Sequence, residues 1–360
     1  MAATLRIPEN ALRDFCTRVF VALGVPEADA RITTDVLVTA DLRGVDSHGV
    51  ARLGRYVTGI KAGSIRPTDV SRIVTSTKAT ALIDGGQSLG QVVAYRAMEI
   101  AIRKAKETAV GIVSVRNSNH YGIAGYYAMM ALSHDLIGMS MTNSAPLVVP
   151  TFGRTALLGT NPISLAAPAS REKAFVLDMA TSVVPRGKLE VLERQGKPIP
   201  PGWAVDKTGR GSTDPKVVLE AMAKRLGGGL LPLGGEGEDL SGHKGYGLAL
   251  LVDVLSGTLS GGATGLAVYA DDLHPNVGHF FLALDPAAFR PLEDFKRDMD
   301  RLARELKDSP KAEGQSRIYL HGEKSFERTE RNRREGVPLG PKVVESLSTI
   351  GRELRIAWPG

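Results

Sequence analysis

Short apolar segments of strand-like composition are mixed with amphipathic helical segments along this chain of 360 residues, and that mixture restricts the fold to the α/β class. The expected strands, bounded mostly by glycine, proline or Asn-Ser clusters, are residues 79–83, 111–116, 136–142, 163–167 and 174–178. Helical periodicity marks residues 10–23, 26–42, 88–106, 122–133, 246–259, 287–306, 325–335 and 340–352. Ser88 is a candidate cap of its helix, and the strongly apolar 246–259 helix is expected to be buried.

The charge of the chain argues against a nucleic-acid-binding protein. Lysine and arginine number 45 against 39 acidic residues, so the formal charge of +6 is small for this length. The basic run at 328–334 contains interleaved acids and no alternating aromatic side chains, which is typical of a solvated helix face. The modest positive field suits an anionic substrate or cofactor.

Cys16 is the only cysteine, so the chain has no intrachain disulfide and no thiolate metal cluster. It falls in an apolar helical pattern, which predicts a buried, inert thiol. The N-terminus lacks the pattern of a secretory signal, and no run of 18 apolar residues is present. We therefore expect a cytoplasmic protein with no membrane partner.

A phosphate-binding glycine loop of the usual kind is missing. No Gly-x-Gly-x-x-Gly follows a strand and opens a helix. The segment 237–245 approaches the loop of nucleotide triphosphatases, but His243 separates glycine from lysine and Gly245 replaces the required hydroxyl residue. Lys244 remains either a cation able to hold a pyrophosphate or carboxamide, or a plain loop lysine.

The first histidine motif is the segment from Asp46 to Arg52. If Asp46 or Ser47 caps a helix, His48 and Arg52 stand four apart on one face. An arginine binds a carboxylate through two parallel hydrogen bonds, and a neighbouring histidine can give a proton to a carbonyl oxygen. The pair fits a 2-oxo acid, although incidental polar residues on a surface helix would look the same. A serine hydrolase is disfavoured because no Gly-x-Ser-x-Gly elbow exists.

The second histidine motif, Ser118-Asn119-His120-Tyr121-Gly122, follows the expected strand 111–116. Polar residues at the carboxyl edge of a strand, next to a helix N-terminus, lie where ligands of α/β proteins commonly bind. The alternative is a loop histidine satisfied by backbone groups. Polar loops also follow or precede other strands, at 140–144, 159–162, 178–182 and 185–188. Metal binding is weakly indicated, because His274 and His279 have no third ligand at a persuasive spacing.

Taken together, these motifs resemble the malate/L-lactate dehydrogenase family that is distinct from the Rossmann-type lactate and malate enzymes. The resemblance extends over about residues 10–340, and eight motifs occur in the family's order. They are Asp41-Leu-Arg-Gly44, Ser47-His48-Gly49, Arg52, Asn119-His120-Tyr121-Gly122, Gly159-Thr160-Asn161-Pro162, Asp178-Met179-Ala180-Thr181-Ser182, Arg186-Gly187-Lys188 and His243-Lys244-Gly245-Tyr246-Gly247.

The resemblance implies an α/β fold with a non-Rossmann NAD(P)-binding domain on a mixed sheet, plus a helical substrate and dimerisation domain. We expect the NAD(P)-binding domain at 121–290 and the helical domain at 1–120 with 291–360. The resemblance also implies NAD or NADP as cofactor, a small 2-oxo or 2-hydroxy acid as substrate, and a homodimer. The family includes malate, lactate, sulfolactate and ureidoglycolate dehydrogenases, with cyclic-imine reductases as a side branch.

By position, the resemblance assigns catalytic roles to Ser47, His48 and His120, and substrate contacts to Arg52, Thr160 and Arg186. The cofactor contacts it implies are His120, Tyr121, Gly122, Ser144, Asp178, Met179, Ala180 and Lys244. One histidine exchanges a proton with the substrate oxygen while hydride passes between the nicotinamide and the carbonyl carbon. Spacing alone leaves open which histidine does so.

One departure from the family bears on the substrate. The imine-reductase branch resembles a Ser-His-Asp relay with an acid immediately after Arg-Gly, whereas this chain has Lys188 there. That disfavours a cyclic imine such as piperideine-2-carboxylate, which stays the alternative substrate. A basic, anion-binding protein without catalysis is a third reading, supported only by the net charge.

Overall fold

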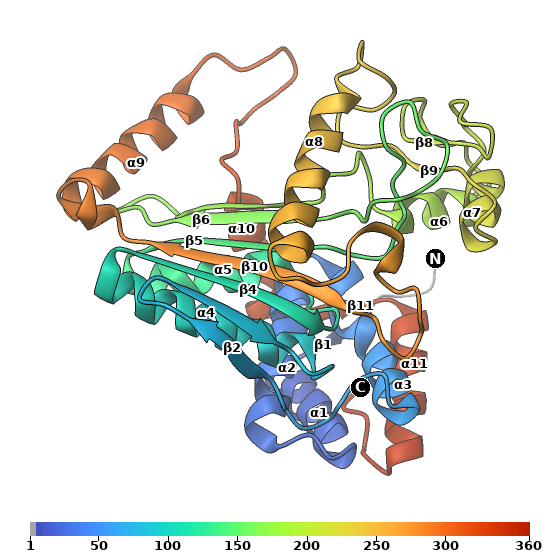
Figure 1. The fold of residues 1–360 in the computed structure, drawn as a ribbon, viewed down its shortest axis with the longest axis horizontal. Coiled ribbons are helices and arrows are strands. Elements are labelled where there is room, and N and C mark those ends of the chain that lie inside the picture. Colours follow the sequence, from blue (N-terminus) through green and yellow to red (C-terminus); the bar gives the residue numbers. More distant parts are fainter. Residues whose placement is uncertain (1–4) are drawn as a thin grey trace.

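A mixed sheet of seven strands forms the centre of the protein in the computed structural model, which describes residues 5–360 (Figure 1). The strand order is β2-β3-β4-β10-β5-β6-β7, and only β3 and β4 are parallel. The strands are β2 Arg72–Ser76, β3 Thr80–Asp84, β4 Val110–Ser118, β5 Ile137–Thr142, β6 Ile163–Ala167, β7 Phe175–Met179 and β10 Val277–Leu284. The expected α/β class with a mixed sheet is confirmed.

All five predicted strands are present within two residues at each end, but β2 and the central strand β10 were not predicted. β10 lies between β4 and β5 and is largely buried. A strand buried on both faces loses the alternation of apolar and polar residues that identifies a strand in a sequence.

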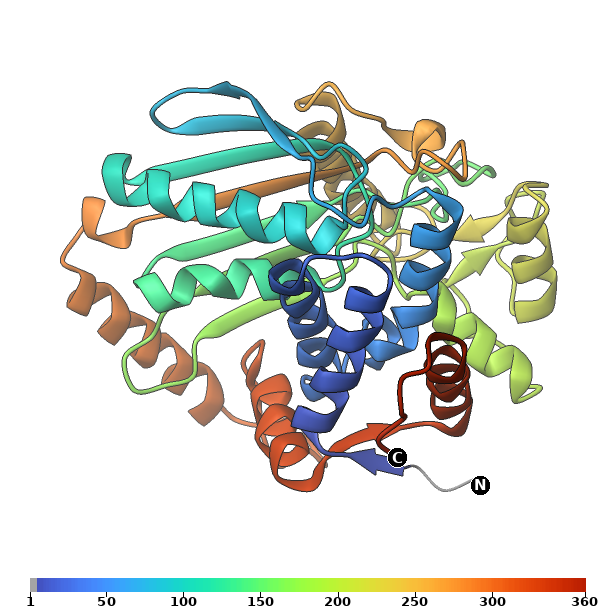
Figure 2. The ribbon, with the colours of Figure 1, turned by 90° about the horizontal axis from the view of Figure 1, so that it is seen from below.

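Two helices, α4 (Gly90–Thr108) and α5 (Ala124–Met130), cover one face of the sheet (Figure 2). Two glycines let them approach closely. A side chain at Gly111 would overlap the Ala101 carbonyl, and one at Gly138 would overlap the Ala128 carbonyl. The predicted cap at Ser88 is wrong, because α4 begins after Leu89 without a side-chain cap and the Ser88 hydroxyl instead accepts the backbone N–H of Val70.

Helices from both ends of the chain form a second layer. They are α1 Glu9–Ala22, α2 Glu27–Leu42, α3 Leu53–Ala62, α10 Glu323–Glu335 and α11 Pro341–Leu354. All of them except α10 contribute to one shared apolar core. Next to them β1 (Leu5–Ile7) pairs with β11 (Val337–Leu339). The sheet nevertheless takes β2, β3 and β4 from before residue 120, so a division at that residue passes through the sheet. Cys16 is buried in this helical core, as predicted.

A small lobe with its own apolar core follows β7 in the chain. It contains α6 Arg186–Arg194, α7 Pro215–Ala223, β8 Ala204–Val205 and β9 Gly229–Leu230 (Figure 1). Asp214 caps α7 by accepting the backbone N–H groups of Lys216 and Val217.

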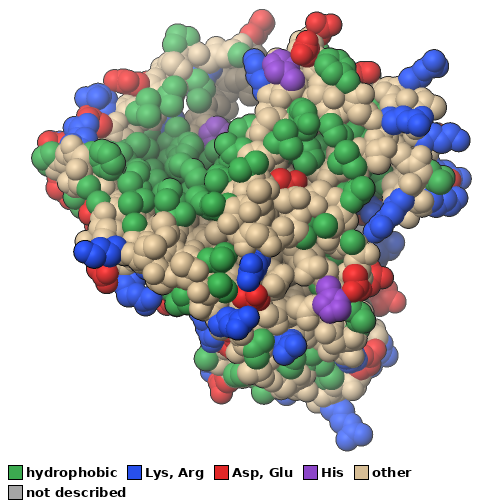
Figure 3. Space-filling model, in the orientation of Figure 1, with side chains coloured by type: hydrophobic (Ala, Val, Ile, Leu, Met, Phe, Trp, Pro, Cys, Tyr) green, Lys and Arg blue, Asp and Glu red, His purple; other side chains and the backbone are tan. Residues whose placement is uncertain are grey.

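The second face of the sheet carries α8 (Gly242–Asp253), and α9 (Leu292–Asp308) projects on the same side (Figure 1). The expectation that the 246–259 helix is buried is wrong for one of its faces, since Leu250, Leu251, Val254 and Leu259 are exposed. Apolar side chains gather on this side of the molecule, in the hollow between α8 and α9 (Figure 3). No helix of residues 5–360 is long and apolar enough to span a bilayer.

Candidate active site

The sheet brings the polar motifs to one edge. β5 is antiparallel to β10 and β6, and β6 is antiparallel to β7, so the ends of β5 and β7 lie beside the start of β6. β4 is also antiparallel to β10 and therefore ends at this same edge. The segments that follow β4, β5 and β7, together with the one that precedes β6, thus meet there, where the sequence placed ligand-binding loops.

The two histidine motifs meet at this edge. The rings of His48 and His120 stack with their centroids 5.6 Å apart and their planes at 21°. His120 extends from the turn after β4, whereas His48 comes from the turn between α2 and α3 in the helical layer. The cluster therefore lies where the helical layer contacts the sheet.

The expected helix carrying His48 and Arg52 on one face is wrong. Two short 3-10 turns, Asp46–His48 and Val50–Arg52, replace it, and the extended backbone of Gly49 separates them. The Arg52 guanidinium donates from Nε to the Ser47 carbonyl at 2.7 Å, so Arg52 still lies beside the Ser47-His48 pair. No side chain caps either turn.

The buried Asp41 carboxylate holds this turn. It accepts the Val50 backbone N–H at 2.7 Å, and burial raises the pKa of Asp41 to about 8. Gly49 passes so close that a β-carbon there would overlap the Asp41 carboxylate. The Asp41-x-x-x-x-x-x-x-Gly49 spacing in the sequence is thus a packing requirement for the histidine turn.

Gly49→Ala is expected to displace the turn and lower the free energy of unfolding by about 1–3 kcal/mol, the usual cost of overpacking. Activity should fall as well, because His48 and Arg52 move with the turn. Chemical denaturation and steady-state kinetics measure the two effects. Gly54→Ala in α3 is the matched control, since its β-carbon would meet nothing closer than 3.8 Å. Equal stability of the two variants would contradict this packing role.

His120 has a defined set of partners. Its Nδ1 lies 2.6 Å from the Tyr56 hydroxyl and accepts the Gly122 backbone N–H at 3.4 Å. Burial, followed by the nearby Arg55 cation, lowers the pKa of His120 well below its usual value, with His48, Arg52 and His279 acting in the same direction. His120 is therefore neutral at pH 7 in the free protein.

His48 is half-buried, as His120 is, but has fewer hydrogen-bond partners among residues 5–360. Its Nδ1 lies 2.9 Å from the hydroxyl of Ser47, which is exposed. Burial lowers the pKa of His48 to about 4, and Arg52 and Arg55 add to that effect. Two arginines thus act on both histidines, which makes the cluster electropositive.

The residues expected to contact the cofactor on the sheet side also come together. Asp178, at the end of β7, accepts the Gly125 backbone N–H of α5 at 2.8 Å, and burial raises the pKa of Asp178 to about 6. The Ser144 hydroxyl accepts the Thr160 backbone N–H at 3.1 Å. Met179 and Ala180 follow Asp178 directly and are half-buried. Tyr121 is buried and lies within hydrogen-bonding distance of Ser140.

Two predicted contact residues are not joined to the cluster by any hydrogen bond or ion pair among residues 5–360. Lys244 is exposed in the first turn of α8, and Arg186 pairs with Glu190 within α6 at 2.9 Å. Lys188, which stands where the imine-reductase pattern has an acid, lies over the Trp203 ring at 5.7 Å. It therefore approaches neither histidine ring in the way a relay acid would.

Sequence reasoning missed three residues of the site: Arg55, Tyr56 and Tyr269. Arg55 and Tyr56 lie in α3, which no pattern predicted, and the Arg55 guanidinium donates to the Tyr269 hydroxyl at 2.5 Å. The only signal for Arg55 was its position three residues after Arg52, which is one helical turn. Tyr269 comes from a loop far along the chain and gave no signal.

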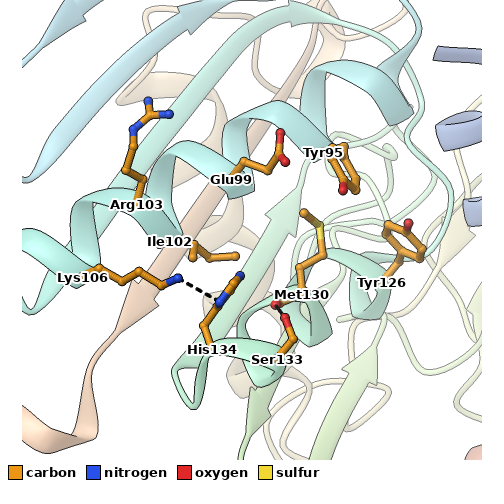
Figure 4. A pocket seen from close by; sticks show the side chains of 9 residues that line it. All are labelled: Tyr95, Glu99, Ile102, Arg103, Lys106, Tyr126, Met130, Ser133 and His134. Atoms are coloured by element: carbon orange, nitrogen blue, oxygen red, sulfur yellow. Dashed lines mark hydrogen bonds between the residues drawn. The ribbon is translucent and has the colours of Figure 1, made fainter. Parts of the chain in front are cut away.

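The other histidines serve different roles. His279 is buried in β10 between the Thr142 and Ser118 hydroxyls, at 2.8 and 2.9 Å, and burial lowers its pKa to about 3. His134 lies 2.9 Å from Lys106 in a cavity of about 530 Å³ between α4 and α5 (Figure 4). That cavity shares no lining residue with the histidine cluster. Within residues 5–360 no three His, Cys, Asp or Glu side chains are grouped to hold a metal ion.

The chain matches a family model described as malate/L-lactate dehydrogenase over residues 7–348. It is 52% identical to malate dehydrogenase of Pyrococcus horikoshii, over 98% of this chain and 96% of that protein. It is 43% identical to L-sulfolactate dehydrogenase of Methanocaldococcus jannaschii, over 96% of each chain. The crystal structure of malate dehydrogenase from Entamoeba histolytica superposes with a TM-score of 0.95 at 35% identity, over 99% of this chain and 100% of that one.

A solved reductase is more distant. The structure of delta1-piperideine-2-carboxylate reductase from Pseudomonas syringae has a TM-score of 0.83 at 26% identity, over 96% of this chain and 100% of that one. Its fold is shared, but its sequence is much further away than those of the malate dehydrogenases. The comparison favours a 2-oxo acid over a cyclic imine.

Proposed function

The chain belongs to the malate/L-lactate dehydrogenase family, and from that membership we propose that it interconverts a dianionic 2-hydroxy acid and its 2-oxo acid, malate and oxaloacetate first, using NAD or NADP. One observation carries the proposal. A half-buried neutral histidine, His120, lies near two arginines, Arg52 and Arg55, that no acidic side chain neutralises among residues 5–360.

The two arginines favour a substrate with two anionic groups. Arg52 is exposed beside the histidines, and its remaining guanidinium donors are free to bind the carboxylate next to the reacting carbon. Arg55 is also exposed, and in the described part of the chain its guanidinium contacts only the Tyr269 hydroxyl and ring. It suits the distal carboxylate of malate or the sulfonate of sulfolactate, the substrates in the names of two similar enzymes.

A nicotinamide cofactor fits the residues at the sheet edge. When bound, it accepts or supplies the hydride. Asp178, Met179 and Ala180 at the end of β7 and Ser144 after β5 present carboxylate, hydroxyl and backbone groups suited to ribose and amide recognition. Tyr121 and Gly122 border the same edge, and Lys244 and Arg186 remain proposed contacts. The protein's choice between NAD and NADP is left to the assay.

We assign the proton step to His120 rather than His48. In oxidation, Nε2 of His120 takes the hydroxyl proton of the substrate, the O–H electron pair forms the carbonyl, and hydride leaves the carbon. Its depressed pKa keeps His120 neutral and ready to accept a proton. His48, stacked on it and bonded to Ser47, contacts the substrate and limits water access. Thr160 adds a hydroxyl on the substrate side.

The assay that tests the proposal is a substrate panel with NADH and with NADPH. Oxaloacetate and sulfopyruvate should be reduced with a kcat/KM at least about 10-fold above that of pyruvate, the factor given by one added charged hydrogen bond. Piperideine-2-carboxylate is the imine arm of the panel. Preferred reduction of the imine, or no reduction of any 2-oxo acid, would refute the proposal.

We also propose that the protein is a homodimer joined through the part of the second sheet face that α8 leaves exposed. One row of apolar side chains crosses five strands in register, and every member is half-exposed. The row is Ile112, Leu282, Met139, Leu165 and Leu177. The exposed apolar side chains of α8 and of the turn that continues it lie beside this row (Figure 3). They are Leu250, Leu251, Val254 and Leu259. A surface that combines an apolar sheet face with a protruding apolar helix can pair with the same surface of a second copy, as a two-fold interface requires.

The helix α9 supports this pairing. Phe295, Met299, Leu302 and Leu306 form an apolar stripe at helical spacing. Among the helices and strands of residues 5–360, however, α9 packs closely only against the turn at Pro286–Ala288. A soluble monomer rarely leaves so large an apolar surface uncovered. The cytoplasmic location predicted from the sequence stays a prediction.

Val254 begins the helical turn that continues α8 and is exposed. Val254→Asp is expected to convert the dimer to a monomer, because the substitution buries a charge in the proposed interface. Sedimentation velocity measures the change. Val217→Asp in α7 is the control, since Val217 is similarly exposed but lies on the small lobe. A wild-type protein that sediments as a monomer, or a dimer unaffected by Val254→Asp, would refute this interface.

A further inference from the structure

One buried cation near the sheet edge has no hydrogen-bond or ion-pair partner among residues 5–360. Arg43 directly follows α2 and is only 8% exposed. Its guanidinium lies over the ring of Phe326, with 4.9 Å between Cζ and the ring centroid. This cation–π contact offsets part of the cost of burying the charge but leaves all five N–H donors unused. A buried group of this kind calls for an explanation.

The backbone around Arg43 is fixed by α10. The Asn332 amide of that helix donates to the Leu42 carbonyl at 3.1 Å. Arg328 of the same helix donates to the Gly44 carbonyl at 3.4 Å. The residues on both sides of Arg43 are thus bound to the helix that also supplies the aromatic ring. The buried position of the guanidinium is therefore built into the packing of α2 against α10.

The end of β7 brings a carboxylate toward this cation. Phe326 packs with Val176 of β7 in one apolar cluster. Asp178 is two residues further along the strand and so points to the same face, where it accepts the Gly125 N–H. In keeping with this placement, the Asp178 charge opposes the effect of burial, which lowers the pKa of Arg43. The two charged groups are neighbours, but they form no ion pair with each other.

The guanidinium of Arg43 lies apart from the histidine cluster and is still open to a ligand. Arg52 and Arg55 lower the pKa of both His48 and His120, whereas Arg43 does not act on either ring. Arg43 is therefore outside the region where the substrate is proposed to bind. None of its unpaired nitrogens is completely enclosed, so a ligand at the sheet edge can reach them.

We propose that Arg43 binds the pyrophosphate of NAD or NADP, and that Asp178 binds the hydroxyls of the ribose next to it. An arginine fork fits phosphate oxygens, and a carboxylate accepts hydrogen bonds from ribose hydroxyls. Pyrophosphate and ribose are covalently joined in the cofactor, so they match a cation and a carboxylate that are neighbours without being paired. The phosphate charge also compensates the buried cation. The inference rests on the proposed NAD(P)-dependent function and adds a residue to its cofactor site.

Arg43→Met keeps the length of the side chain and removes its charge. The Kd of NADH and of NADPH should rise about 10- to 100-fold, the effect of losing hydrogen bonds to a charged group. The midpoint of urea unfolding of the free protein should stay the same or rise, because an unpaired cation is no longer buried. Fluorescence titration measures the Kd without turnover. A purely structural residue would show the reverse, a lower midpoint with an unchanged Kd.

Lys173→Met is the matched control. Lys173 lies over the same Phe326 ring at 5.9 Å, but it is exposed and paired with Glu330 at 2.7 Å. Its replacement should leave the Kd of both cofactors unchanged. Arg43→Lys keeps the charge without the fork, so its Kd should rise by less than about 10-fold.

ADP carries the pyrophosphate but neither nicotinamide nor a 2′-phosphate, and its displacement of bound cofactor should weaken in Arg43→Met by a similar factor. Unchanged ADP affinity with weaker NADPH binding would place another phosphate at Arg43 and overturn the inference. A higher Kd accompanied by a lower unfolding midpoint would also count against it. If Arg43→Met binds both cofactors as tightly as wild type, the inference is wrong and the proposed function stands. A wild-type protein that binds neither NADH nor NADPH would contradict the proposed function itself.

Discussion

Replacing His120 by glutamine is expected to lower kcat about 10²- to 10⁴-fold in both directions, the usual contribution of a positioned acid or base. The reason lies in its surroundings. His120 is held at Nδ1 by Tyr56 and Gly122, and no hydrogen bond to its Nε2 is found among residues 5–360. Glutamine keeps a polar group of similar reach but cannot take a proton. Steady-state rates of malate oxidation and oxaloacetate reduction measure the loss.

His48→Gln is the matched variant that tests which of the two histidines exchanges the proton with the substrate. His48 shares the same electropositive surroundings, but among residues 5–360 its ring is hydrogen-bonded only to the hydroxyl of the exposed Ser47. We expect a smaller fall in kcat, about 10-fold, and a rise in KM, because a contact made in ground and transition states alike acts mainly on binding. If the large loss follows His48 and not His120, the assignment of the two histidines must be reversed.

The fold was predictable where periodicity was strong. The amphipathic helices α1, α2 and α4 and the five predicted strands follow from the spacing of their apolar residues. The central strand β10 did not follow, because a buried strand with His279 inside it resembles neither a two-sided strand nor an amphipathic helix. The mixed sheet was implied by family resemblance, while its strand order required the structure.

The site was predictable as a set of motifs but not as a geometry. The polar strand-end loops singled out in the sequence meet at one edge of the sheet, and the structure brings His48 and His120 together. The expected helix at 46–52 is wrong because the Asp41 carboxyl accepts the Val50 backbone N–H, which in a helix would bond to the Asp46 carbonyl. Arg55 contacts Tyr269 and Tyr56 contacts His120, each in an element distant in the chain, and single-sequence spacing carries no signal for such contacts.

The different substrate dependence expected for the Arg52 and Arg55 variants is the sharpest test of substrate class. Arg52→Leu is expected to lower kcat/KM by about 10²- to 10³-fold for every 2-oxo acid, because losing a charged partner costs about 2–5 kcal/mol. Arg55→Leu should lower kcat/KM by a similar factor for oxaloacetate and sulfopyruvate but by less than about 5-fold for pyruvate, which lacks a distal charge. Kinetics with the three acids measure both effects.

Tyr269→Phe is the control for Arg55, since it removes the hydroxyl that holds the guanidinium at 2.5 Å while leaving the ring beneath it at 5.3 Å. We expect only a partial loss of kcat/KM with the dianionic substrates. The Arg55 guanidinium keeps its charge and its place over the ring, and only one of its five N–H donors loses a partner. Arg55 also lowers the pKa of His120, so its removal should move the acid limb of malate oxidation to higher pH. An Arg55→Leu variant that loses activity equally with pyruvate and oxaloacetate would show that Arg55 acts on His120 alone. The distal anionic group of the substrate would then need another partner, and Arg186 is the remaining candidate.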